Sequence, residues 1–514
     1  MSRTSKSIRN VFVAIIGRII LMLIGFFARK LFILFLSVEY LGLNGLFSSV
    51  LTVLSIMELG LGPAMIFSLY KPLAENNISV CQALMAVYRK AYHAIGFAVL
   101  IIGCSITPFI TRLIKEIPDN IYGIHIIYVM FVVNAAVSYF FSYKRSLIIA
   151  SQNQYIIQSI HIVAYLILNL LQILILAFTK NYFLYLGLQI ISTFCENYLL
   201  SKHAEKSFPW ILEKKEYKLP EDKKSEVLRN IKAMVFHKIG GIVLDATDNL
   251  LISKFFGLSF LGFYSNYVLI INAVKSFIQS PFSSITASIG DFGVSKTPEE
   301  SYKLYKKVQF INFWLTAFST ISIFILINPF ISLIWLNDNY LITFPILVVV
   351  VLNFYIDGMR KTILTFKEAY GLPWYDRYKP LIGAAVNLFF SIWLQSFMGV
   401  IGIFWGTTIT QLLVNVWFEA FVVFKFVFHK KLTFFFAEYF LQNLMFLGIL
   451  AVTYGICSLL PSTSIISFII YVGVCVVVPN GLISLFYHNT NEYKFFWGLI
   501  YTYIRRKKDI SKFT

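Results

Sequence analysis

Long apolar runs separated by short polar segments dominate the chain. Each run has about 20 residues, the length that an α-helix needs to cross a hydrocarbon core of about 30 Å. The runs centre near residues 24, 56, 100, 132, 166, 190, 244, 272, 320, 350, 388, 412, 446 and 474. This pattern predicts an all-α polytopic membrane protein with 14 transmembrane helices.

The apolar pattern also repeats at a separation of about 220 residues. Val38–Leu43 (VEYLGL) is matched by Leu258–Phe263 (LSFLGF), and further matches pair Asn169-Leu170 with Asn387-Leu388 and Gly187 with Gly406. Six predicted helices separate each residue from its match, so the second copy returns to the orientation of the first. The sequence therefore predicts two parallel six-helix lobes related by a pseudo-twofold axis, plus two extra C-terminal helices.

These predictions divide the chain into five parts. Residues 1–200 form the N-terminal lobe and residues 231–430 the C-terminal lobe. Residues 201–230, rich in Lys and Glu, form a cytoplasmic linker between them. Residues 431–490 hold helices 13 and 14, and residues 491–514 form a basic cytoplasmic tail along the inner membrane interface.

Composition and charge support a membrane protein rather than a nucleic-acid-binding one. Hydrophobic residues make up 58% of the chain and charged residues 13%, although the net charge is +19. Most Lys and Arg residues fall in every second predicted loop, which is the positive-inside pattern. We therefore expect both termini in the cytoplasm, membrane lipids as partners, and no nucleic-acid partner.

No motif in the sequence indicates an enzyme. The metalloprotease, P-loop, serine-hydrolase and dinucleotide-binding motifs are absent, and the five cysteines have no metal or redox spacing. We therefore expect no catalytic residue, no metal and no cofactor.

Basic residues inside the predicted helices are candidates for a cationic cavity, because a charge in the membrane centre needs a partner or water. Arg18 and Arg29 lie eleven residues apart, within about 20° of one helix face. Arg18 coincides with Lys238 at the 220-residue offset, and Lys275 lies in the eighth predicted helix. Alternatively, Arg18 and Lys238 reach the inner headgroups, whereas Arg29 and Lys30 reach the outer ones.

Polar stripes mark the second and eighth predicted helices, which occupy matching places in the two copies. Each stripe ends beside an expected helix break, at Gly60–Pro63 and at Ser280–Pro281. Such an arrangement predicts a transporter's substrate path, with Glu58, Asn272 and Gln279 as its polar lining. The alternative is that the stripes only pack helices together.

Two carboxylates in the seventh predicted helix, Asp245 and Asp248, leave two interpretations open. They can be proton or sodium sites that couple transport to an ion gradient. They can instead be counter-ions for Arg29, Lys238 and Lys275.

The segment Ser37–Glu75 (SVEYLGLNGLFSSVLTVLSIMELGLGPAMIFSLYKPLAE) resembles the first two helices of the Wzx-type polysaccharide transporters. These are lipid-linked oligosaccharide flippases of the multidrug/oligosaccharidyl-lipid/polysaccharide (MOP) superfamily. The resemblance implies alternating-access export of undecaprenyl-diphosphate-linked repeat units across the bacterial cytoplasmic membrane. It also implies a polysaccharide polymerase and a chain-length regulator as partners. Arg18 matches the basic position that recurs in the first helix of the family.

Two other functional classes remain as alternatives. A cation-coupled multidrug exporter of the same superfamily would bind organic cations through Glu58, Asp245 and Asp248. A membrane-embedded glycosyltransferase or polymerase would need a large loop outside the membrane with acidic or Arg-rich chemistry, which the sequence lacks. A flippase is the preferred interpretation, because a diphosphate headgroup needs fixed positive charge to cross a low-dielectric layer.

Overall fold

The computed structural model describes residues 3–58, 61–213, 241, 246–460 and 464–498, with side chains from residue 16 onward. These residues form α-helices joined by short turns, and no β-strand occurs among them. The chain divides into two compact units, Met1–Ser265 and Asn266–Thr514. The predicted Lys238 and Asp245, and most of the predicted linker, lie outside the described residues.

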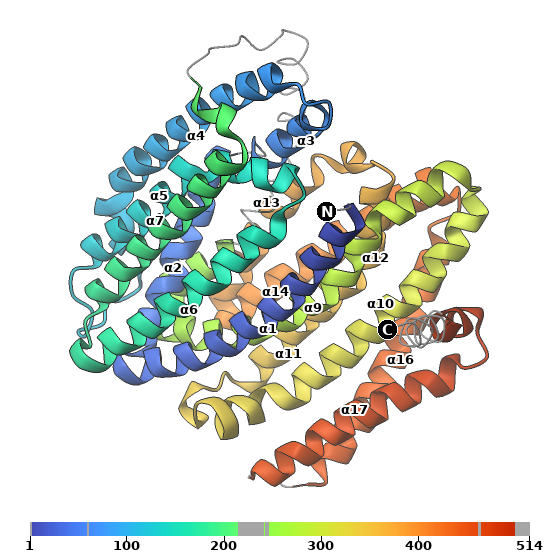
Figure 1. Cartoon of the computed structure of the whole chain (residues 1–514). Helices are drawn as coiled ribbons and strands as arrows, with labels where there is room; N and C mark the ends of the chain where they lie inside the picture. Colours follow the sequence, from blue (N-terminus) through green and yellow to red (C-terminus); the bar gives the residue numbers. More distant parts are fainter. Residues whose placement is uncertain (1–2, 59–60, 214–240, 242–245, 461–463, 499–514) are drawn as a thin grey trace, which may run out of the picture. The chain divides into compact units, whose positions relative to one another are not determined.

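The first unit is a bundle of long helices. They are α1 (Arg3–Phe35), α2 (Val38–Leu54), α3 (Leu61–Ala74), α4 (Ile78–Ile106), α5 (Ile124–Ala150), α6 (Gln154–Thr179) and α7 (Tyr182–Ser207). Within this unit α5 packs against α4 and α7, and α1 packs against α6 (Figure 1). Residues 246–256 are also helical.

The second unit contains most of α9, which begins in the first unit, and the helices that follow. They are α9 (Leu258–Ser295), α10 (Pro298–Pro329), α11 (Phe344–Met359), α12 (Lys361–Ala369), α13 (Lys379–Met398), α14 (Val400–Thr410), α15 (Trp417–Val423), α16 (Thr433–Ser458) and α17 (Ile465–Tyr487). Helices α13 and α14 pack together as a hairpin. Gly399 makes the tight turn between them at φ 64°, a conformation that favours glycine.

Ten helices of the described residues are long and apolar enough to cross a membrane. The chain is therefore a multi-pass membrane protein, as the sequence predicts. Ten of the predicted helix centres fall within these spans, and the centres near 24, 190 and 350 fall on α1, α7 and α11. The centre near 244 lies outside the described residues, so fourteen crossings remain a prediction.

Two glycines of the sequence repeat make matching contacts within the first unit. A Cβ atom at Gly42 would collide with the carbonyl oxygen of Leu258, and one at Gly262 would collide with that of Val38. Val38 and Leu258 are themselves separated by the repeat offset of 220 residues. Glycine at both positions therefore allows the two backbone segments that begin at Val38 and Leu258 to approach each other closely.

The two expected helix breaks have different outcomes. Near the first, α2 ends at Leu54 and is followed by a 3-10 turn, Ser55–Glu58, while Leu61–Pro63 already belong to α3 and Gly60 lies outside the described residues. The segment Ser280–Pro281 does not end its helix, since α9 continues through Pro281 to Ser295. A proline removes one backbone hydrogen bond, and a long helix with many remaining bonds can continue past it.

Candidate functional site

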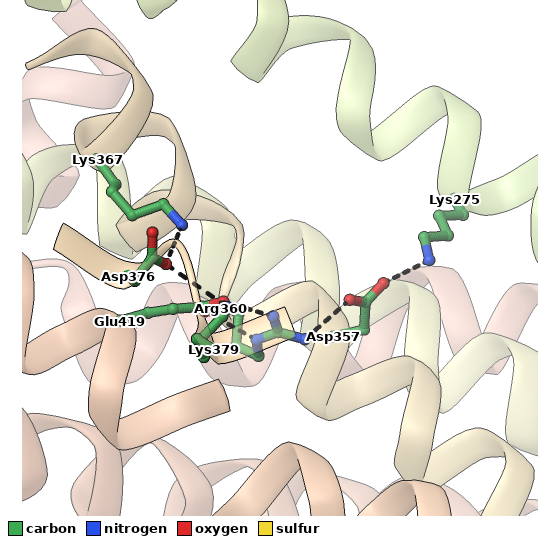
Figure 2. A network of polar contacts seen from close by, with 7 residues as sticks. All are labelled: Lys275, Asp357, Arg360, Lys367, Asp376, Lys379 and Glu419. Atoms are coloured by element: carbon green, nitrogen blue, oxygen red, sulfur yellow. Dashed lines mark hydrogen bonds and ion pairs between the residues drawn. The ribbon is translucent and has the colours of Figure 1, made fainter. Parts of the chain in front are cut away.

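A network of seven charged side chains lies in the second unit (Figure 2). Its residues come from α9, α11, α12, α13, α15 and the connecting turns. They are Lys275, Asp357, Arg360, Lys367, Asp376, Lys379 and Glu419. The elements from α11 onward are separated by short turns, which bring residues distant in sequence to one place.

Local structure explains why these side chains meet. Asp357 lies in the last turn of α11 and Arg360 follows it by three residues, a spacing that puts both on one helix face. Gly371, at φ 66°, turns the chain after α12 toward Asp376. Lys379 then begins α13, at a helix N-terminus where the dipole disfavours a cation. A neighbouring carboxylate is needed to offset that cost.

Arg360 is the centre of the network. Its Nε and Nη2 atoms donate to the two carboxylate oxygens of Glu419 at 3.0 and 2.7 Å. Its Nη1 atom lies 3.4 Å from Oδ1 of Asp357. Lys379 also donates from Nζ to Glu419. A guanidinium suits this position because its planar donors can hold two carboxylates at once.

Further ion pairs extend the network at both ends. Lys367 donates from Nζ to Asp376 at 2.6 Å, and Lys379 lies 3.8 Å from the same carboxylate. At the other end, the Nζ atom of Lys275 on α9 lies 2.5 Å from Oδ2 of Asp357. Figure 2 shows this last pair joining α9 to the remainder of the network.

Burial divides the network into an inner and an outer part. The side chains of Glu419 and Asp376 are 0% exposed, whereas those of Lys275 and Asp357 are 40% and 29% exposed. A fully buried charge needs a partner of opposite charge. Removing one member of such a pair leaves the other charge buried and unpaired, which is strongly destabilising. The inner part therefore needs all of its partners, while the outer pair is the more exposed part of the network.

A small recess of about 20 Å³, room for about one water molecule, lies beside the outer pair. Its lining comes from α9, α11 and the start of α12 and consists of Lys275, Ile278, Gln279, Phe354, Asp357, Gly358 and Lys361. The structure thus brings together Lys275 and Gln279, two residues that the sequence analysis selected. Asn272, selected with them, is exposed on α9 and does not line this recess.

The other selected residues that the structure describes belong to the first unit. Arg29 donates from Nη1 to Oγ of Ser265 at 3.0 Å and to its carbonyl oxygen at 3.3 Å. Glu58 accepts a hydrogen bond of 3.1 Å from the hydroxyl of Tyr92. Arg18 is exposed on α1, and Asp248 is half-buried in the helical residues 246–256. Convergence of the selected cations on one cavity remains a prediction.

The sequence analysis did not select the carboxylates of this network. Asp357, an ion-pair partner of Lys275, is among the residues that it missed. A usable signal was present, because Asp357 and Glu419 are isolated acids within strongly apolar runs, VVVVLNFYID and LLVNVWFEAFVVF. Such residues are rare in membrane segments and need a specific partner.

Comparison with known proteins gives a match at the level of structure. No protein-family model matches the chain, and no curated protein matches its sequence. The inward closed conformation of the lipid II flippase MurJ matches at a TM-score of 0.66 and 14% identity, over 94% of this chain and 99% of MurJ. The chain therefore shares the fold of this flippase.

Two MATE transporters share this fold. The MATE transporter VcmN of Vibrio cholerae matches at a TM-score of 0.58 and 13% identity, over 84% of this chain and 100% of its own. An inward-facing MATE family transporter of the MOP superfamily matches at 0.59 and 11% identity, over 78% and 94%. The same fold thus occurs in a lipid II flippase and in MATE transporters.

Proposed function

We propose that this protein is a flippase for lipid-linked oligosaccharides, with the recess at Lys275 as part of its substrate path. In this proposal it moves undecaprenyl-diphosphate-linked repeat units from the inner to the outer leaflet of a bacterial cytoplasmic membrane. It does so by alternating access, and it neither makes nor breaks a covalent bond. The repeat units would then be used for surface or capsular polysaccharide.

The charge of the ion-pair network is the observation that carries this proposal. Four cations in the network face three carboxylates, so one positive charge is in excess. The most exposed of the cations is Lys275, which lines the recess. A diphosphate crossing a low-dielectric layer needs such fixed positive charge, whereas its polyprenyl tail can remain in the lipid.

Coverage of the chain also favours a flippase. The match to the lipid II flippase MurJ extends over 94% of this chain, against 84% and 78% for the two MATE transporters. The two extra C-terminal helices predicted from the sequence correspond to α16 and α17, both long and apolar enough to cross a membrane.

A cation-coupled multidrug exporter is the second candidate. The MATE matches favour it, and so does the presence of carboxylates among the polar side chains within the helices. In that case Asp357, Glu58 and Asp248 would be the groups that attract organic cations or coupling ions. Proton or sodium coupling through Asp248 is also compatible with a flippase.

Deletion of the gene in its source organism distinguishes the two candidates. A flippase defect is expected to remove surface polysaccharide and to leave lipid-linked repeat units in the inner leaflet. An exporter defect is expected to leave the polysaccharide intact and to increase sensitivity to organic cations. Measuring both properties in one strain, with the intact gene restored as the control, decides between them.

A further inference from the structure

The recess beside the ion-pair network holds two lysines and one carboxylate. Lys275 and Lys361 both line it, together with Asp357. Within the part of the chain that the structure describes, the Lys361 ammonium forms no ion pair. Arg360, the next cation, is already engaged by both oxygens of Glu419. The recess itself therefore has one more positive than negative charge.

The contact between Lys275 and Asp357 can be exchanged. The two atoms are 2.5 Å apart, but the side chains are 40% and 29% exposed. Ion pairs whose side chains are partly exposed contribute little to stability. A competing anion that supplies stronger acceptors to Lys275 can therefore replace this carboxylate at small cost.

Asp357 keeps a second cation when it leaves Lys275. Its other carboxylate oxygen, Oδ1, lies 3.4 Å from Nη1 of Arg360, three residues further along the chain. The bidentate contact with Glu419 holds that guanidinium in place. Exchange at Lys275 consequently does not leave an unpaired carboxylate in the protein interior, which would be costly.

We propose that Asp357 is an exchangeable counter-ion, displaced from Lys275 by a phosphate of the substrate headgroup, and that Lys361 is the second cation that binds this phosphate. The proposal rests on the proposed function. A diphosphate presents several strong acceptor oxygens, which two ammonium groups can share, and the Gln279 amide can donate a further hydrogen bond.

This exchange gives the site a way to release what it binds. While the recess is empty, Asp357 neutralises Lys275, so no uncompensated cation remains inside the unit. When the headgroup is bound, its phosphate lies at the mouth of the recess, which is too small to enclose it, and takes over that role. The Asp357 carboxylate then competes with the phosphate for Lys275 and so favours release of the substrate. A transporter must release every substrate that it binds.

Binding of farnesyl diphosphate to the purified full-length protein tests the proposal. Calorimetry at fixed ionic strength is expected to show about tenfold tighter binding for Asp357→Asn, because Lys275 loses its competitor. Lys361→Gln is expected to bind about tenfold more weakly. Lys361→Arg is expected to restore most of the affinity, because it restores the charge.

Two variants elsewhere in the second unit control for the change in net charge. Glu299→Gln breaks the exposed pair with Lys430, and Lys296→Gln breaks the exposed pair with Glu300. Both are expected to bind farnesyl diphosphate as the wild type does. If these variants changed the affinity as much as Asp357→Asn and Lys361→Gln do, the changes would come from the net charge of the protein, and a local exchange would be refuted.

The outcomes separate this proposal from the proposed function. Wild-type binding together with unchanged or weaker binding by Asp357→Asn refutes the exchange and leaves a flippase possible. Absence of binding by the wild type contradicts both. Misfolding does not imitate the expected gain in affinity. If Asp357→Asn cannot be purified in folded form, unchanged affinity in Lys361→Gln refutes the two-lysine site.

Discussion

Replacement of Glu419 by Ala is expected to destabilise the second unit by about 3 to 5 kcal/mol. The Glu419 side chain is 0% exposed and accepts from both Arg360 and Lys379, which are themselves 12% and 8% exposed. Its removal leaves two buried cations with too few acceptors. In a unit of this size such a loss lowers the apparent melting temperature by about 6 to 20 °C.

Thermal unfolding of the purified protein, followed by intrinsic fluorescence, measures this effect. Glu299→Ala is the matched control, because Glu299 pairs with Lys430 at 2.9 Å but is 57% exposed. Its loss is expected to leave the melting temperature close to that of the wild type. Combining Glu419→Leu with Arg360→Met and Lys379→Met should recover part of the stability, since no unpaired charge then remains at this centre. Equal melting temperatures for Glu419→Ala and Glu299→Ala would show that this centre does not stabilise the unit.

Replacement of Lys275 by Ala is expected to reduce surface polysaccharide at least about tenfold, with the protein still folded. Activity is lost without loss of the fold, because Asp357 keeps its contact with Arg360 when the Lys275 side chain is removed. Lys275→Arg should retain part of the activity, because the charge that meets the phosphate is kept. Lys275→Glu should abolish it, because a second carboxylate would face the anionic headgroup.

Surface polysaccharide is measured in cells with equal amounts of each variant in the membrane. Lys296→Ala is the control, since Lys296 follows the end of the same helix and its pair with Glu300 is exposed. Normal polysaccharide in Lys275→Ala, at the level given by the control, would exclude this lysine from the substrate path.

The helices were predictable from the sequence because the membrane sets their length and composition. Runs of about 20 apolar residues have one stable solution in lipid, a helix that satisfies its own backbone. The repeat was also visible, since close contacts at Gly42 and Gly262 leave little choice of residue. The continuity of α9 through Pro281 was not predictable, because one proline can either end a helix or only interrupt its hydrogen bonding.

The candidate site was predictable only in part. Lys275 stood out as a cation in an apolar helix, and Gln279 lies one turn beyond it. Its partner Asp357 lies 82 positions further along the chain, and nothing in local sequence relates the two. Arg360 and Glu419 likewise meet only after α11 and α15 have packed. Pairing of distant charges is a property of tertiary structure, whereas the presence of a lone charge is a property of sequence.

Translocation by the purified protein in liposomes tests the central claim most directly. A fluorescent polyprenyl-diphosphate-linked saccharide is placed in one leaflet, and the fraction reaching the other leaflet is read with an impermeant quencher. The account predicts faster transfer with the wild-type protein than in protein-free liposomes, and little or no acceleration with Lys275→Ala. No acceleration by the wild type, together with uptake of an organic cation by the same liposomes, would contradict the account and identify a drug exporter.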